Sequence, residues 1–302
     1  MFRSYFTKRK MPMWVVFAVL VLLLLAGCGN GTPAASSFSS TPASQSASSN
    51  TGFTTASNGN VATATLKHTP TGTANLSWDH TTRMLTVQVM LTGLAPHSIH
   101  PNHIHEGSCA SQGKVLYPLT NLVVDEHGAA QATTKIHLLN GIPAKGLYLN
   151  VHNGPALTTA AQFLPIACSD IINQDTSLRS DQTVVLAFPA APSGSLNENA
   201  NGMTNLSLSG HTLTVKLELS GLQPYSQHAA HIHSGSCVSQ GAVIYPLNTV
   251  KADAAGKATV TTIIQNVTTI PSTGWYVNVH RNTDLSTQTG FDPIACGDVV
   301  LN

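Results

Sequence analysis

Two copies of one segment, PNHIHEGSCASQGKVLYPL (101–119) and AAHIHSGSCVSQGAVIYPL (229–247), lie 128 residues apart in this chain. The same offset relates KGLYLNVH (145–152) to TGWYVNVH (273–280). It also relates PIACSD to PIACGD at residues 165–170 and 293–298. The sequence therefore contains an internal repeat, which predicts two domains of the same fold.

Each copy has the pattern of an all-β domain. Segments 83–92 and 211–221 alternate apolar and polar residues, which is the period of a strand with one buried face. A shorter strand precedes each of them across a turn, at 75–79 and 205–208, as in a β-hairpin. Further strands are predicted at 129–137, 146–152, 257–264 and 274–280. Strands at this spacing favour two tandem Greek-key β-sandwich or barrel domains.

The 302 residues divide into five predicted parts. Small polar residues that carry no charge make up the segment before the first strand, and such a segment cannot bury enough apolar area to fold. The predicted layout is a signal peptide (1–28), a flexible tether (29–60), a first domain (61–172), a linker (173–183) and a second domain (184–302).

Charge excludes one class of partner. Only 9% of the residues are charged and the net charge is +1, so the chain has no basic surplus to neutralise the phosphates of nucleic acid. The unusual number is 14 histidines, as many as lysines and arginines together.

The amino terminus has the layout of a secretory signal, with a cationic start, an apolar run from Met13 to Ala26 and the ending Leu-Ala-Gly-Cys at 25–28. This ending resembles a bacterial lipobox, which implies that Cys28 is lipidated and becomes the first residue of the mature protein. An uncleaved anchor helix is the alternative. Both interpretations predict an extracytoplasmic protein held at the bacterial cell membrane.

Four further cysteines follow the repeat. Three pairings are open to four cysteines, and the repeat favours Cys109–Cys168 with Cys237–Cys296, because each domain then closes on itself. An exported protein permits the oxidation. The rival interpretation is a thiolate metal site, but the wide spacing and the lack of a Cys-x-x-Cys motif argue against it.

The histidines recur with the repeat, as His-x-x-His-x-His followed by a later Val-His. Residues i and i+2 of a strand point to one face about 6–7 Å apart, so a His-x-His pair can share one ion. A third imidazole comes from the Val-His strand end, and the first histidine of the motif is a candidate fourth ligand. Imidazoles without thiolates suit copper or zinc. The predicted ligands are His103, His105, His152 and His100 in the first copy, and His231, His233, His280 and His228 in the second.

At these residues the sequence resembles copper/zinc superoxide dismutase. That family has a His-x-His pair on a strand, a cysteine in the loop that follows, a later Val-His copper ligand and an Ala-Cys near the end. The resemblance implies a Greek-key β-sandwich with one copper ion per domain. The Tyr-x-Asn-Val-His string (148–152 and 276–280) also resembles the CHRD domain, a related β module not established as an enzyme.

Two departures from the dismutase pattern concern the metal and the substrate. No histidine lies between His233 and His280, where the dismutase places its bridging histidine and its zinc ligands, so the resemblance argues against zinc. Pro165 and Pro293 stand where the dismutase has an arginine that guides the anion.

Three functions remain open from the sequence. The first is copper-only superoxide dismutation, the second is a non-enzymatic protein that buffers or delivers copper, and the third is a metal-free CHRD-like binding module. The expected partners are the membrane, through lipidated Cys28, and either superoxide or a copper donor or acceptor.

Overall fold

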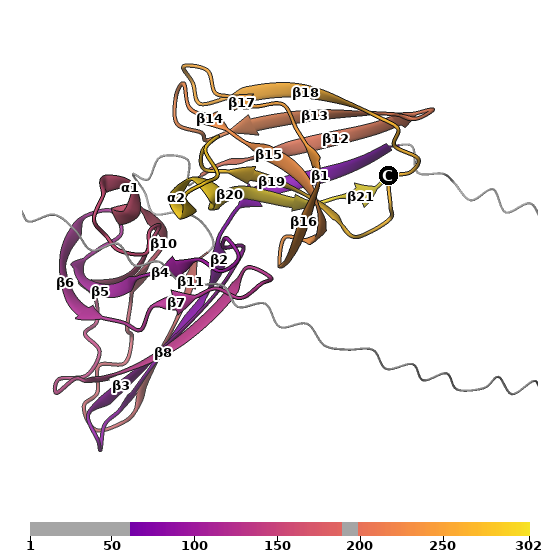
Figure 1. Ribbon diagram of the computed structural model, residues 1–302. Helices are drawn as coiled ribbons and strands as arrows, with labels where there is room; N and C mark the ends of the chain where they lie inside the picture. Colours follow the sequence, from indigo (N-terminus) through magenta and orange to yellow (C-terminus); the bar gives the residue numbers. More distant parts are fainter. Residues whose placement is uncertain (1–60, 189–198) are drawn as a thin grey trace, which may run out of the picture. The chain divides into compact units, whose positions relative to one another are not determined.

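The computed structural model describes residues 61–188 and 199–302 (Figure 1). Antiparallel strands dominate both stretches, so the all-β prediction is confirmed. The predicted signal peptide, the lipidated Cys28 and the tether lie outside the described residues. Within the described residues, no helix has the length and apolar character needed to cross a membrane.

The two repeats contain matching elements in the same order. The first repeat comprises β2 (Thr71–Asp79), β3 (Met84–Thr92), β4 (Ile99–His100), β5 (Asn102–Gly107), β6 (Gln112–Pro118), β7 (Leu122–Val123), β8 (Ala129–His137), β9 (Leu147–His152), α1 (Ala160–Phe163) and β10 (Pro165–Ile171). The second comprises β12 (Asn201–Ser209), β13 (Thr212–Ser220), β14 (Gln227–His228), β15 (Ala230–Ser236), β16 (Ser239–Pro246), β17 (Val250–Lys251), β18 (Ala258–Gln265), β19 (Trp275–His280), α2 (Gln288–Phe291) and β20 (Pro293–Asp298). The remaining strands are β1 (Val61–His68), β11 (Gln182–Phe188) and β21 (Val300–Leu301).

The predicted hairpins are present. β2 pairs with β3 and β12 pairs with β13 along their whole lengths. Every second side chain of β2 from Ala74 to Trp78 is buried, as the alternation in the sequence predicts. The Asp79 carboxylate accepts hydrogen bonds from the backbone N–H groups of Thr81 and Thr82, and thereby closes the turn between β2 and β3.

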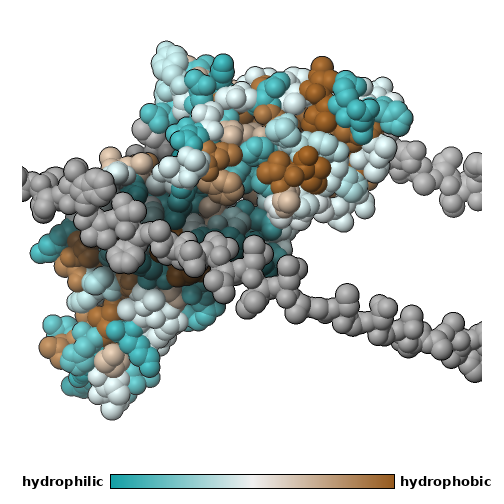
Figure 2. Space-filling model, viewed as in Figure 1, coloured by the Kyte–Doolittle hydropathy of each residue, from teal (hydrophilic) through white to brown (hydrophobic). Residues whose placement is uncertain are grey.

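Each repeat contains two four-stranded layers. In the first repeat these are the sheets β10-β9-β5-β6 and β11-β2-β3-β8. In the second repeat the equivalent layers are joined, because β1 pairs with both β20 and β12. The inward faces of the two layers form one apolar core per repeat, and on the face shown in Figure 2 the exposed apolar side chains form separate patches among polar ones. We call β10-β9-β5-β6 and β20-β19-β15-β16 the site layers.

The first strand of each repeat belongs to the other repeat. β1 precedes the first hairpin in the chain but lies beside β12, whereas β11 precedes the second hairpin but lies beside β2. Leu66 of β1 is accordingly part of the core of the second repeat, and Leu186 of β11 is part of the core of the first. The predicted boundaries treated each repeat as one contiguous stretch, and the sheets differ from them by this exchange. The apolar alternation of a strand specifies which face is buried but not which edge it joins.

Two disulfides close the site layers. Cys109 bonds to Cys168, and Cys237 bonds to Cys296, with Cα–Cα distances of 5.9 and 5.8 Å. This is the pairing that the repeat favoured. Beside each bond an aspartate carboxylate accepts a hydrogen bond from the backbone N–H of the first cysteine. Asp170 accepts from Cys109 at 2.7 Å, and Asp298 accepts from Cys237 at 2.8 Å.

The strand exchange predicts cross-repeat effects on stability. Leu66→Ala should destabilise the second repeat and Leu186→Ala the first, each by about 2–5 kcal/mol, because both side chains are buried and leave a cavity. In hydrogen exchange, L66A should deprotect amides of β12, and L186A should deprotect amides of β2. Val185→Ala is the control for L186A, since Val185 is the neighbouring residue on β11 and its side chain is exposed. Deprotection of β2 rather than β12 by L66A would contradict the exchange.

Candidate metal centre

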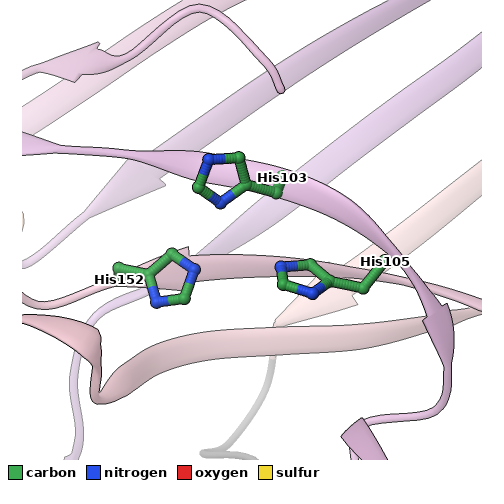
Figure 3. A group of neighbouring side chains, drawn as sticks. All are labelled: His103, His105 and His152. Carbon is green, nitrogen blue, oxygen red and sulfur yellow. The ribbon is translucent and has the colours of Figure 1, made fainter. Parts of the chain in front are cut away.

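Three imidazoles meet on the site layer of each repeat. His103 and His105 lie two residues apart on β5, and His152 ends the neighbouring strand β9. Figure 3 shows the three rings turned toward one another. One ring nitrogen from each lies within 4.8 Å of the others. In the second repeat the same grouping is formed by His231, His233 and His280.

The geometry of the two clusters is nearly the same. In the first cluster, the ring of His103 lies 5.6 Å from that of His105 and 5.2 Å from that of His152, measured between ring centroids. The corresponding distances in the second cluster are 5.5 and 5.1 Å. The third distance, between His105 and His152, is 5.9 Å, and its counterpart between His233 and His280 is 6.0 Å. The two copies of the repeat therefore build the same arrangement.

Backbone carbonyls orient two of the three rings. Nδ1 of His105 lies 3.1 Å from the carbonyl oxygen of Gly113, and Nδ1 of His152 lies 2.9 Å from that of Phe163. A ring nitrogen facing a carbonyl must donate, so Nδ1 carries the proton and Nε2 keeps its lone pair. Nε2 of His105 is buried and has no hydrogen-bond partner. Metal-binding histidines show this pattern, because the outer hydrogen bond fixes the tautomer and aims the other nitrogen.

The second cluster repeats the orientation. Nδ1 of His233 donates to the carbonyl of Gly241 at 3.0 Å, and Nδ1 of His280 donates to that of Phe291. Nε2 of His233 is buried without a partner. Nε2 of His280 instead lies 3.1 Å from Nδ1 of His231.

The third ring contributes its other nitrogen. Nδ1 of His103 is buried and has no partner, and Nδ1 of His231 is the atom that meets His280. Each cluster thus directs one Nδ1 and two Nε2 atoms at a common space. Three nitrogen donors without thiolate are a set that copper and zinc accept, so the residues fit a bound transition metal.

Burial favours the neutral, ligating form of five of these imidazoles, those of His103, His152, His231, His233 and His280. Burial, together with repulsion from His152 and His105, lowers the pKa of His103 to about 4. Burial also lowers the pKa of His280 to about 4, although the hydrogen bond to Phe291 acts in the other direction. The pKa of His233 is lowered by the same cause. At neutral pH the rings therefore present lone pairs rather than charges.

The predicted fourth ligands lie elsewhere. His100 is fully buried, and its Nδ1 lies 2.8 Å from the backbone carbonyl of His152, while its Nε2 lies 2.8 Å from Oγ of Ser98. His228 makes the same two contacts, with the carbonyl of His280 and with Ser226. Both nitrogens of each ring are engaged, so the structure places these histidines behind the clusters, where they hold the backbone of a ligand.

The six histidines that lack a repeat partner do not join the clusters. His127 and His137, which fall in the interval where a dismutase has zinc ligands, are exposed. His80 does meet Asp79 and Asp181, with Nδ1 2.7 Å from Asp181 Oδ1, but this group lies on the surface and uses its atoms in a turn.

Arg281 does not stand in for the missing guiding arginine. It is almost fully buried. Burial raises the pKa of the Asp292 carboxyl to about 7, and the Arg281 guanidinium acts in the opposite direction. The first repeat has Asn153 and Leu164 at the two corresponding positions. These two residues therefore differ between the repeats, and Oδ1 of Asp292 lies 3.8 Å from Nε2 of His100 in the first repeat.

Tyr148 and Tyr276 also form part of the two sites, a role that the sequence pattern did not predict. Tyr148 stacks on His105 with ring centroids 4.9 Å apart, and Tyr276 stacks on His233 at the same distance. The available signal was the Tyr-x-Asn-Val-His string itself, which places tyrosine four residues before a ligand in both copies.

Comparison with known proteins gives one family. The model of the CHRD domain matches residues 53–155 and 175–284. Among solved structures, a clock protein, EA4, is 14% identical, covering 34% of this chain and 88% of its own, with a TM-score of 0.26. A superoxide dismutase-like protein from Bacillus subtilis is 17% identical, covering 32% of this chain and 88% of its own, with a TM-score of 0.24. No curated protein matches the sequence.

The depressed pKa values predict that the metal-free protein is unstable in mild acid. Unfolded imidazoles take up protons near pH 6.5, whereas His103 and His280 do so only near pH 4 in the folded chain. Between these values the unfolded state binds more protons, so the free energy of unfolding should fall as pH drops from about 6.5 to about 4. Urea unfolding at a series of pH values measures this.

Two variants make the test specific. His280→Gln should flatten the pH dependence, because one buried imidazole no longer has to stay neutral. His211→Gln should leave it unchanged, since His211 is exposed and meets water in both states. An equally steep dependence in H280Q and the parent protein would contradict the assignment.

Proposed function

The chain belongs to the CHRD domain family, and on that premise we propose that each of its two repeats binds one copper ion through three imidazoles. The observation that carries the proposal is the directed donor set: two Nε2 atoms and one Nδ1 atom converge in each repeat. Backbone carbonyls hold the outer nitrogens of two of the three rings. The ligands are His103, His105 and His152 in one site, and His231, His233 and His280 in the other.

Copper rather than zinc is proposed on two grounds. The ligand set is purely imidazole, which suits both metals. The spacing of the histidines follows the copper ligands of the dismutase pattern. The second repeat has no histidine in the interval of the zinc loop, and His127 and His137 of the first repeat are exposed and outside the cluster. When bound, copper supplies one-electron chemistry by changing between Cu(II) and Cu(I).

Superoxide dismutation is the second candidate, and one observation favours it. His103 and His231 are only half-buried, whereas the other four ligands are buried, so each site opens toward solvent on one side. A small anion could reach the metal there. Against efficient steering, Pro165 and Pro293 replace the arginine of the dismutase pattern, and Arg281 is buried.

Copper stoichiometry tests the main proposal. The purified chain should take up about two equivalents of Cu(II) at pH 7.5, one per ligand cluster. His231→Ala with His233→Ala should lower this to one, because the clusters share no ligand. His80→Ala and His211→Ala are controls that should keep both sites, since neither ring belongs to one of the two three-histidine clusters. Metal analysis after removal of free copper gives the readout.

The alternatives give different results. If the parent chain takes up no copper, the metal-free module becomes the leading function. If it takes up two equivalents but shows no superoxide turnover above a variant that lacks both His-x-His pairs, copper buffering or delivery is the function.

The proposed location is the outer side of the bacterial cell membrane, with a lipid on Cys28 as anchor and residues 29–60 as spacer. Cys28→Ser should abolish lipid labelling and processing at residue 28. It should leave copper uptake unchanged, because the spacer separates residue 28 from the first strand. Metabolic labelling with a fatty acid measures the loss, and a C28S protein that is still labelled and membrane-bound would refute the lipobox.

A further inference from the structure

We propose that the side-chain amide oxygens of Asn150 and Asn278 are the fourth donors to the metal, and that they bind Cu(II) in preference to Cu(I). The inference rests on the proposed function, copper binding by the two histidine clusters. It replaces the fourth ligand that the sequence predicted, since both ring nitrogens of His100 and His228 are engaged elsewhere.

Strand register places Asn150 inside the first cluster. β5 and β9 pair so that His103 lies opposite Asn150 and His105 lies opposite Tyr148. Tyr148 stacks on His105, so the cross-strand pairs at this place point to the face that carries the cluster. Side chains alternate along a strand, and Asn150 is two residues from both Tyr148 and His152. It therefore occupies the middle of that face, between two residues already in the site.

The second repeat has the same placement. His231 lies opposite Asn278 and His233 lies opposite Tyr276, which stacks on it. The asparagine again stands midway between the tyrosine and the last histidine of its strand. The motif thus supplies a tyrosine, an amide and a ligand histidine to one face, at every second position.

Both amides lack a partner that their burial calls for. Asn150 and Asn278 are each 1% exposed, and the Oδ1 atom of each is buried without a hydrogen bond. A buried acceptor left unsatisfied costs about 1–3 kcal/mol, so such atoms are rare unless a ligand completes them. The same cost retained in both repeats points to a ligand that both sites take.

The chemistry of the donor sets the oxidation-state preference. An amide oxygen is a hard, neutral donor that suits Cu(II), whereas three imidazoles suffice for the softer Cu(I). The hydroxyls of Tyr148 and Tyr276 are the competing oxygens in the two sites, and both are buried. A neutral phenol hydroxyl is a weaker donor to Cu(II) than an amide oxygen, so the amide is the stronger candidate.

The first repeat offers a matched control. Asn102 also lies on β5, is fully buried and has an unpartnered Oδ1, but it precedes His103 by one residue and so faces the opposite side. Its Nδ2 donates to the carbonyl of Thr120 at 2.8 Å. The second repeat has the buried Ala230 at this position, so the fold accommodates alanine there.

The experiment uses the full chain with His231→Ala and His233→Ala, so that only the first site binds copper. Asn150→Ala should weaken Cu(II) binding about 10-fold and leave Cu(I) binding within about twofold, as measured by competition with chromophoric chelators. The Cu(II)/Cu(I) potential should rise by about 59 mV, the value of a tenfold change for one electron. The Cu(II) EPR spectrum should change as an oxygen donor is lost.

Two further variants complete the test. Asn102→Ala should change neither affinity, while Asn150→Asp, which keeps the volume and adds charge, should bind Cu(II) at least as tightly as the parent. Equal Cu(II) affinity in N150A and the parent would overturn the proposal, and so would equal losses for both oxidation states, which indicate a structural role. Absence of copper uptake by the parent chain would instead reject the proposed function, and the amide assignment with it.

Discussion

The antiparallel register between β5 and β9, and between β15 and β19, is the constraint on which the rest of the site depends. Because side chains alternate strictly, a slip by one residue would turn His103 and His105 away from Tyr148 and His152. Several local features hold the register. Gly107 adopts a positive φ of 107° where β5 is bulged against β6, and its N–H donates to the carbonyl of Gly146 at 2.9 Å, just before β9 begins. Only glycine adopts this conformation without strain.

The backbone around the ligands does much of the work that side chains do elsewhere. The carbonyls of Gly113 and Phe163 fix the tautomers of His105 and His152. His100 in turn forms a hydrogen bond with the carbonyl of His152. The result is a preorganised set of lone pairs in which protonation is disfavoured by burial. Such ligands need little rearrangement to bind a cation, because the fold already fixes the orientation of their rings.

The two repeats keep the site and vary its surroundings. Ring distances agree within about 0.1 Å between the clusters. The buried Arg281 and Asp292 of the second repeat, however, are replaced by Asn153 and Leu164 in the first. The exchange of β1 and β11 also makes the stability of each core depend on the other copy. The two matching sites therefore lie in repeats that exchange a strand rather than in two self-contained stretches of chain.

The sequence by itself determined the repeat, the hairpins, the disulfide pairing and the six clustered histidines. Each of these depends on local alternation or on comparison of one copy with the other, and both are written in the residue order. The strand exchange, the position of His100 behind the site and the roles of Tyr148 and Asn150 were decided only by tertiary structure. The edge that a strand joins, the carbonyl that a ring nitrogen meets and the residue opposite a histidine all depend on partners distant in sequence. No local pattern in this chain encodes those partners, because they arise from how the sheets assemble.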